Sequence, residues 1–143
     1  MKINKIIREE MLETLKDLIL EADGNDADAM KIIFSNGSTD LCEVGFKDII
    51  LYTLSSSSAR YRFQASDDSY LLRSVADSDG TVSEFRIIGR NNPGTTPATY
   101  GTIITGTVGN LITSADITFN MINWVDGTFI SIENLDFTLP DGV

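Results

Sequence analysis

The acidic side chains are the first residues in this sequence to consider for metal binding or acid–base chemistry, because several of them lie close together. The run Asp77-Ser-Asp-Gly80 is like the opening of a calcium-binding loop, in which alternate carboxylates coordinate the ion. A third oxygen ligand is missing before the glycine, and Glu84 comes too early to be the closing bidentate carboxylate. Because Asp-Gly is also a favoured short turn between strands, we expect a hairpin turn here rather than a cation site.

Two further groups of carboxylates fit connectors better than sites. The segment 23–28 reads Asp-Gly-Asn-Asp-Ala-Asp, and its glycine and alanine interrupt the spacing that a ligand set needs. We expect it to be a solvated connector. Asp67 and Asp68 are adjacent, and neighbouring side chains of an extended segment point apart, so they cannot share one substrate. A turn is expected there.

Three other features have a chemical and a structural interpretation. Trp124 could stack on a sugar together with the loop 91–100, but a core or rim aromatic at the end of a β-sandwich is the favoured reading. Gly106-Thr-Val-Gly109 lacks the lysine and the following helix of a phosphate loop, which favours a bend in a strand. Cys42 lies in a short apolar segment and is expected to be a buried small hydrophobe.

The chain contains no histidine, which removes the commonest general base, activator of nucleophiles and metal ligand. We therefore predict a protein that is not an enzyme, with no catalytic, cofactor-binding or metal-binding residues and no required cofactor. An enzyme that works with carboxylates alone is the least favoured class.

The composition excludes several partners. A length of 143 residues predicts a single domain over 1–143, and 21 acidic against 11 basic residues give a net charge of −10. That charge disfavours binding to nucleic acid and to anionic membrane surfaces. One cysteine allows no intrachain disulfide. Because no signal peptide or membrane-spanning run is visible, we expect synthesis and folding in a cytoplasm.

One helix is predicted near the start of the chain, over 4–22 within an N-terminal segment 1–23. Asn4 is a suitable N-cap, and Gly24 a suitable residue just beyond the end. The expected buried stripe, widened by Leu12 and Ile19, consists of residues at helical spacing: Ile7, Met11, Leu15, Leu18 and Ala22. The solvated face is assigned the charged residues Arg8, Glu9, Glu13, Lys16 and Asp17. The stripe should pack on the β domain or on a neighbouring subunit.

The remainder, 29–140, is predicted to be an antiparallel β-sandwich of jelly-roll-like type, which makes the chain mainly β. Eight or nine strands with turn signals every 8–12 residues are typical of sandwiches and barrels. The expected strands lie at 29–34, 41–46, 49–54, 60–65, 70–76, 82–88, 102–108, 115–120 and 129–139. No helices separate them, so a parallel α/β fold is excluded.

The last expected strand changes its phase. Ile130 and Ile132 occupy even positions, whereas Leu135, Phe137 and Leu139 occupy odd ones. One extra residue at 133–134, in a β-bulge, would turn all five inwards. We therefore expect a central or near-central strand, with the Asp136 side chain on the opposite, outer face.

Taken together, the chain resembles a group of short virion structural proteins of tailed bacteriophages. The resemblance rests on the helix leading into Lys31-Ile-Ile-Phe-Ser-Asn-Gly37 and on the central strand Phe85-Arg-Ile-Ile-Gly89. It also rests on the ending, namely Gly106-Thr-Val-Gly109, Ala115-Asp-Ile-Thr-Phe119 and Gly127-Thr-Phe-Ile-Ser-Ile-Glu-Asn-Leu-Asp-Phe-Thr-Leu-Pro140. It covers the two ends of the chain and leaves residues 41–80 unmatched.

This resemblance implies a jelly-roll-like capsid decoration, or cement, protein located in the virion. Such a protein binds the assembled head, contacts the major capsid protein and clamps neighbouring capsomers. A homo-oligomer, either a dimer or a trimer, is expected, with the helix or the loops at the contact. The alternatives are a carbohydrate-binding β-sandwich on a tail or fibre, which would use Trp124 and the loop 91–100, and a structural component of the tail or the head–tail junction.

Overall fold

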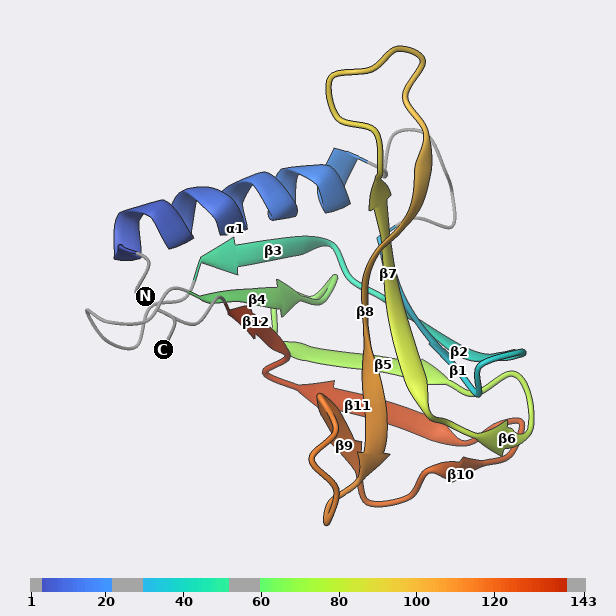
Figure 1. The fold of residues 1–143 in the computed structure, drawn as a ribbon. Helices are drawn as coiled ribbons and strands as arrows, with labels where there is room; N and C mark the ends of the chain where they lie inside the picture. Colours follow the sequence, from blue (N-terminus) through green and yellow to red (C-terminus); the bar gives the residue numbers. More distant parts are fainter. Residues whose placement is uncertain (1–3, 22–29, 52–59, 139–143) are drawn as a thin grey trace.

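The computed structural model describes residues 4–21, 30–51 and 60–138. This part of the chain forms one helix and twelve strands, and the predicted mainly β architecture is confirmed (Figure 1). The elements are α1 (Lys5–Leu20), β1 (Lys31–Ser35), β2 (Asp40–Gly45), β3 (Asp48–Leu51), β4 (Arg60–Gln64), β5 (Leu71–Val75), β6 (Gly80–Thr81), β7 (Glu84–Arg90), β8 (Tyr100–Asn110), β9 (Ile117–Phe119), β10 (Asn123–Trp124), β11 (Phe129–Glu133) and β12 (Asp136–Thr138). No helix of the described residues is long and apolar enough to cross a membrane.

The strands form a curled, sandwich-like arrangement of two layers. One layer is a five-stranded sheet in the order β2-β1-β7-β8-β9. The other contains the sheet β12-β4-β3 and the pair β11-β5, whose strands run across the direction of β7 and β8 (Figure 1). The small pair β10-β6 closes one end, and α1 covers the opposite end of the sandwich.

The predicted strands appear at nearly the predicted places, but two details differ. The short strands β6 and β10 were not expected, because two residues carry no periodicity. The pair β8–β9 is parallel, with Val108 opposite Ile117, whereas an all-antiparallel fold was expected. The six-residue loop between them carries the chain back beside Val108, so that β9 starts in the same direction as β8.

Helix α1 begins and ends close to its predicted bounds. The Asn4 side chain accepts a hydrogen bond of 2.8 Å from the Ile6 N–H, which confirms the predicted N-cap. Ala22, the predicted segment end at 23 and the expected terminator Gly24 lie outside the described residues.

The buried face of α1 differs from the predicted stripe. Leu12 and Ile19 are fully buried, whereas Ile7 and Met11 are about half exposed. The helix is therefore rotated by roughly one residue, about 100°, from the expected orientation. Tyr61 of β4 explains the rotation, because its hydroxyl donates to Glu13 and its ring lies 5.7 Å below the Lys16 ammonium. Glu13 and Lys16, which were assigned to the solvated face, thus dock the helix. Arg8 was assigned to the same face, but it is 5 % exposed, so that assignment is wrong.

This docking contact predicts a loss of stability at alkaline pH. Burial, and then the hydrogen bond to Glu13, raise the pKa of Tyr61 above its ordinary value of 10.0. Above pH 10 the unfolded chain therefore loses this proton before the folded protein does, so stability falls as pH rises, by up to about 1.4 kcal/mol per pH unit. Chemical unfolding between pH 8 and 11 should show a shallower loss in Tyr61→Phe than in the wild type, and equal slopes would contradict the assignment.

The core contains two clusters of aromatic rings. Phe34 of β1 lies at the centre of the first, with ring centroids 5.7 Å from Phe119 and 5.8 Å from Trp124. The second joins Phe46, Phe63 and Phe137 beneath the three-stranded sheet. The segment Gly106–Gly109 lies within β8, so the expectation that it belongs to a strand is confirmed. A Cβ at Gly106 would lie 2.3 Å from the Phe85 ring of the neighbouring strand β7, so a larger residue does not fit there.

The last predicted strand divides into β11 and β12 where the bulge was expected. Asn134 has a φ of 57°, in the left-handed region, and separates β11, which pairs with β5, from β12, which pairs with β4. Ile130 and Ile132 are buried as predicted, and Leu135 and Phe137 pack against the core, whereas Leu139 lies outside the described residues. The inward orientation of these four side chains is confirmed, whereas the predicted β-bulge within one strand is wrong, because a turn between two strands takes its place.

The predicted central position of this strand and the free outer face of Asp136 are both wrong. β11 and β12 each lie at the edge of their sheet, because the turn at Asn134 moves the chain from one sheet to the other. Asp136 accepts hydrogen bonds from Arg62, 2.6 Å to Nε and 3.0 Å to Nη2, and from Arg60 at 3.3 Å. Its carboxylate thus joins β12 to β4.

Candidate partner-binding surface

Of the two residues considered as a cation site, Asp79 uses its carboxylate to bind protein backbone, and Asp77 is held through its own backbone N–H. Asp79 accepts a hydrogen bond of 2.7 Å from the Asp126 N–H, and the Asp77 N–H donates to the Leu41 carbonyl at 2.9 Å. The predicted hairpin turn is wrong, because β5 pairs with β11 and β6 with β10, so this segment connects two separate strand pairs. Within the described residues, no three His, Cys, Asp or Glu side chains are placed to hold a metal ion.

The pair Asp67 and Asp68 forms the predicted turn, and the two side chains diverge. Asp67 accepts hydrogen bonds from the Ser69 hydroxyl at 2.6 Å and from its N–H at 3.0 Å, and these bonds lower the pKa of Asp67. Asp68 has a φ of 68° and pairs with Lys47. Both carboxylates fix the corner between β4 and β5. The acidic segment 23–28 lies outside the described residues.

Trp124 is a core residue, as the structural interpretation predicted. Its side chain is 2 % exposed, its ring packs edge-on against Phe34 and Phe119, and its N–H donates to the Met121 carbonyl at 2.9 Å. The loop 91–99 projects from the opposite end of the β7–β8 hairpin (Figure 1). The fold therefore does not bring together the two parts of the carbohydrate-binding alternative.

Cys42 is fully buried in β2, which confirms its predicted role as a small apolar side chain. Its Sγ lies 3.6 Å from the Val75 carbonyl oxygen, and burial raises the pKa of the thiol. Both features keep the sulfur protonated and inaccessible, so it is unsuited to nucleophilic chemistry.

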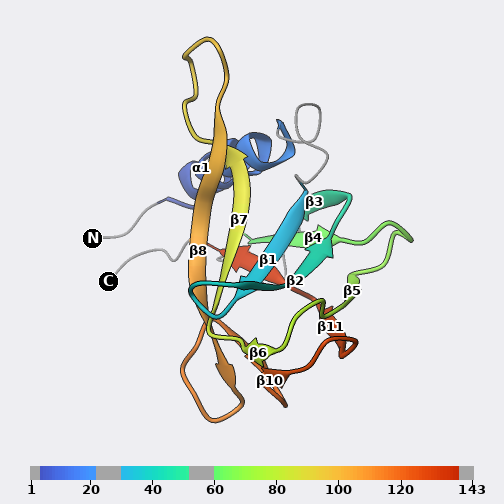
Figure 2. The same cartoon turned by 90° about the vertical axis from the view of Figure 1, so that its right-hand side faces the viewer.

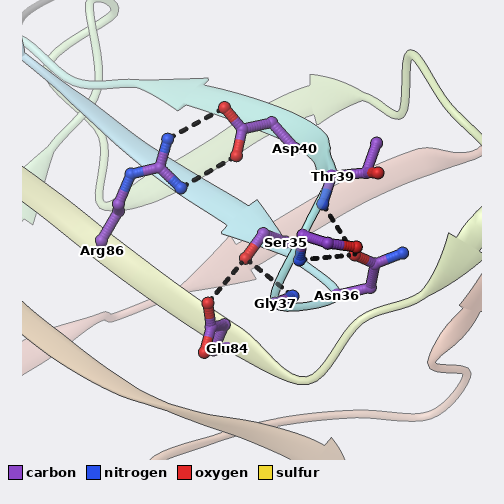
Figure 3. A network of polar contacts seen from close by, with 8 residues as sticks. Ser35, Asn36, Gly37, Thr39, Asp40, Glu84 and Arg86 are labelled. Atoms are coloured by element: carbon purple, nitrogen blue, oxygen red, sulfur yellow. Dashed lines mark hydrogen bonds and ion pairs between the residues drawn. The ribbon is translucent and has the colours of Figure 1, made fainter.

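A network of polar side chains spans β1, β2 and β7 around the β1–β2 turn (Figure 3). Arg86 forms a bidentate pair with Asp40, with distances of 2.8 and 2.9 Å. The Ser35 hydroxyl donates to Glu84 at 3.1 Å and accepts the Gly37 N–H at 3.3 Å. Asn36 accepts the Thr39 N–H at 2.8 Å in the Asn-Gly turn between β1 and β2, where Gly37 has a φ of 98°.

This network braces a turn and offers no reactive group. The hydrogen bond from Arg86 lowers the pKa of Asp40, so the carboxylate stays ionised and is a poor proton donor. Ser35 is 3 % exposed and already gives its proton to Glu84, so it is not accessible as a nucleophile. The cluster shows how β7 is tied to the β1–β2 hairpin on the outer face of the sheet.

The surface with the strongest binding character is apolar and lies at the end of the sandwich opposite α1. It is formed by the β8–β9 loop, the β9–β10 connection and the start of β11, at the lower edge in Figure 1. Ile112 is 93 % exposed, Phe129 87 % and Met121 64 %. We call this surface the apolar end, and it consists of Leu111, Ile112, Met121, Val125 and Phe129.

A groove of about 230 Å³ lies within the apolar end, with Met121 and Phe129 both in its wall and Trp124 at its base. The loops around it are held by their own hydrogen bonds. Thr113 Oγ1 donates to the Asn110 carbonyl at 2.8 Å, and Thr128 Oγ1 donates to the Val125 carbonyl at 2.7 Å. These side chains are thus displayed on an ordered framework, which limits the entropy lost when a partner binds.

Sequence reasoning did not identify the apolar end. Leu111 and Ile112 follow Gly109-Asn110 where turn residues are usually polar, and Val125 precedes Asp126-Gly127. Large apolar residues next to residues typical of turns were the only feature of the sequence that could have indicated this surface. A second exposed apolar strip lies on α1, where Ile6, Ile7 and Met11 face away from the core.

Comparisons with protein-family models, curated proteins and solved structures found no match for this chain.

Proposed function

We propose that this protein is a non-enzymatic virion structural protein that decorates the assembled head of a tailed bacteriophage and stabilises the contacts between capsomers. Its partner is the major capsid protein, and the protein acts as a dimer or trimer located in the virion. The family resemblance of the sequence suggests the class. The observation that carries the proposal is the apolar end, an exposed surface suited to binding a macromolecule.

The energetic argument rests on the size of the exposed side chains. A phenylalanine buries about 150–250 Å² when it is covered, and burial is worth roughly 25 cal/mol per Å², so one such residue can contribute several kcal/mol. Phe129 and Met121 flank a groove, an arrangement in which a few buried anchors dominate the affinity. Leaving these side chains in water is unfavourable unless a partner covers them.

The charge of the protein supports a basic partner surface. A net charge of −10 steers association towards cationic patches and opposes self-association through charged faces. Binding should therefore weaken as salt increases, while the apolar contact keeps it from being lost entirely.

Replacing Phe129 by aspartate should abolish binding to the particle without unfolding the protein. Phe129 is 87 % exposed, so the change removes an apolar anchor and adds a charge at the contact, with little effect on folding. Recombinant protein is mixed with purified heads that lack it and then sedimented. The wild type is expected in the pellet, and Phe129→Asp in the supernatant.

Ile6→Asp on α1 is the matched control, because it also places an aspartate at an exposed apolar position, and α1 lies far from the apolar end. It should sediment with heads like the wild type. If Ile6→Asp alone abolishes binding, the helix is the contact and the assignment of the apolar end is wrong. If the wild type binds neither heads nor tails, the virion function itself is contradicted.

A further inference from the structure

Most of the outer edge of β8 has no strand beside it among the described residues. β9 pairs only with Val108, Gly109 and Asn110, which leaves the edge of Tyr100–Thr107 open on that side (Figure 2). These eight residues include no charge and no proline, the devices that commonly protect an exposed edge. A shift of register between Ile87 and Ile88 separates the upper part of the edge from the lower part, which begins at Ile104.

The backbone of the lower part presents hydrogen-bonding groups to the outside. The Val108 N–H donates to the Ser83 carbonyl at 2.8 Å and thus faces β7. The Thr107 N–H, one residue earlier, faces away and is bound by the Asp116 carboxylate at 2.8 Å. Because these directions alternate in an antiparallel ladder, the N–H and C=O of Thr105 also face away from β7. The Asp116 carboxylate accepts the hydrogen bond that a backbone carbonyl of a neighbouring strand would accept. The outward N–H and C=O of Thr105 are the next groups along β8 with which such a strand could pair.

A groove of about 310 Å³ with both apolar and polar side chains in its wall, Asp116 and Asp136 among them, lies beside this edge, between the two layers. Ile104, Phe85 and Ile87 line it from the five-stranded sheet, and Phe137 and Leu135 line it from the other layer. A strand added beside β8 would point every second side chain towards the same face as Ile104, and hence into this groove. The edge supplies backbone pairing, and the groove supplies pockets for alternate side chains.

We propose that the edge Ile104–Thr107 accepts an extended segment of a partner protein as an added strand, with apolar side chains at alternate positions in the groove. The segment also carries lysine or arginine, because this chain has a net charge of −10 and Asp116 lies at the pairing edge. The same charge disfavours a second copy of the chain as the occupant. This proposal deepens the assembly function by specifying the form of the partner segment, on a surface separate from the apolar end.

The test compares two substitutions of one residue. Thr105→Pro removes the outward N–H of β8 and leaves the bonds to β7, and proline is tolerated on an edge strand with its nitrogen facing outwards. Thr105→Val keeps the N–H and is the matched control. A library of random peptides of about twelve residues is panned on the isolated wild type. Recovered peptides should alternate apolar residues, contain lysine or arginine, bind Thr105→Val as tightly as the wild type, and bind Thr105→Pro at least about tenfold more weakly.

Hydrogen exchange in the unsubstituted protein provides a second readout that does not depend on how Thr105→Pro folds. Bound peptide should slow exchange of the Thr105 N–H. Peptides without alternation, equal binding to Thr105→Pro, or unchanged exchange at Thr105 would each overturn the proposal. So would a wild-type dimer, measured by sedimentation equilibrium, that becomes monomeric in Thr105→Pro, since the occupant would then be a second copy. The peptides contain no particle, so a negative result here leaves the head-binding test unaffected.

Discussion

The Asp136→Ala variant should lose about 3–5 kcal/mol of unfolding free energy, the range for removing one partner of a buried ion pair. Asp136 accepts two hydrogen bonds from Arg62, and the two side chains are 16 % and 10 % exposed. Without the carboxylate, the Arg62 guanidinium stays in a poorly solvated position with its main acceptor missing. Urea unfolding monitored by circular dichroism at neutral pH measures the loss.

Two companion variants separate charge from packing at this site. Asp136→Asn keeps the shape of the side chain and one acceptor oxygen, so it should lie between the wild type and Asp136→Ala. Asp68→Ala removes an exposed carboxylate paired with Lys47, and it should cost no more than about 1 kcal/mol, as exposed pairs do. If Asp136→Ala costs as little as Asp68→Ala, the pair with Arg62 does not hold β12 to β4.

Truncating Phe34 to alanine should cost about 3–5 kcal/mol, a large part of a total stability of roughly 5–15 kcal/mol. Phe34 is fully buried and its ring contacts those of Phe85, Phe119 and Trp124, so the cavity left by the change is enclosed on several sides. The substitution should lower the denaturant midpoint strongly and leave the steepness of the transition unchanged.

Phe129→Ala is the matched control for this prediction. It makes the same change of side chain at an 87 % exposed position, and it should alter the stability by less than about 0.5 kcal/mol. Phe137→Ala should lie between the two, because Phe137 is only partly buried although it stacks on Tyr61 at 5.8 Å. A neutral Phe34→Ala would mean that the aromatic cluster does not organise the core.

The positions of the strands could be predicted because alternation with period two is a local property of the sequence. The pairing of the strands could not be predicted, because a strand at the edge of a sheet and a strand in its centre can show the same alternation. Asp136 illustrates this limit. Its outward position in the alternation indicated solvent, but the neighbouring strand β4 supplies Arg62 at that position.

The orientation of α1 shows a second limit. Two overlapping apolar stripes run along the helix and share Leu15, so the sequence favours neither strongly. Tyr61 decides between them through Glu13 and Lys16, and that contact joins residues nearly fifty positions apart. The apolar end was missed for a related reason, since exposure in a folded protein depends on what packs nearby and not on residue type alone.

The left-handed residue Asn134 has a consequence for the order in which the protein can fold. β5 and β4 each depend for one neighbour on a strand that follows them by more than fifty positions, β11 for the first and β12 for the second. During synthesis, one backbone edge of each of these two strands therefore stays unpaired until residues 129–138 have left the ribosome. Pairing strands so far apart in the sequence is slow, because a long loop must be closed at a cost in chain entropy. If the ribosome pauses before this segment, the incomplete domain would expose two unpaired strand edges and be prone to aggregate. Both missing strands then pair in one step, because only the turn at Asn134 separates β11 from β12.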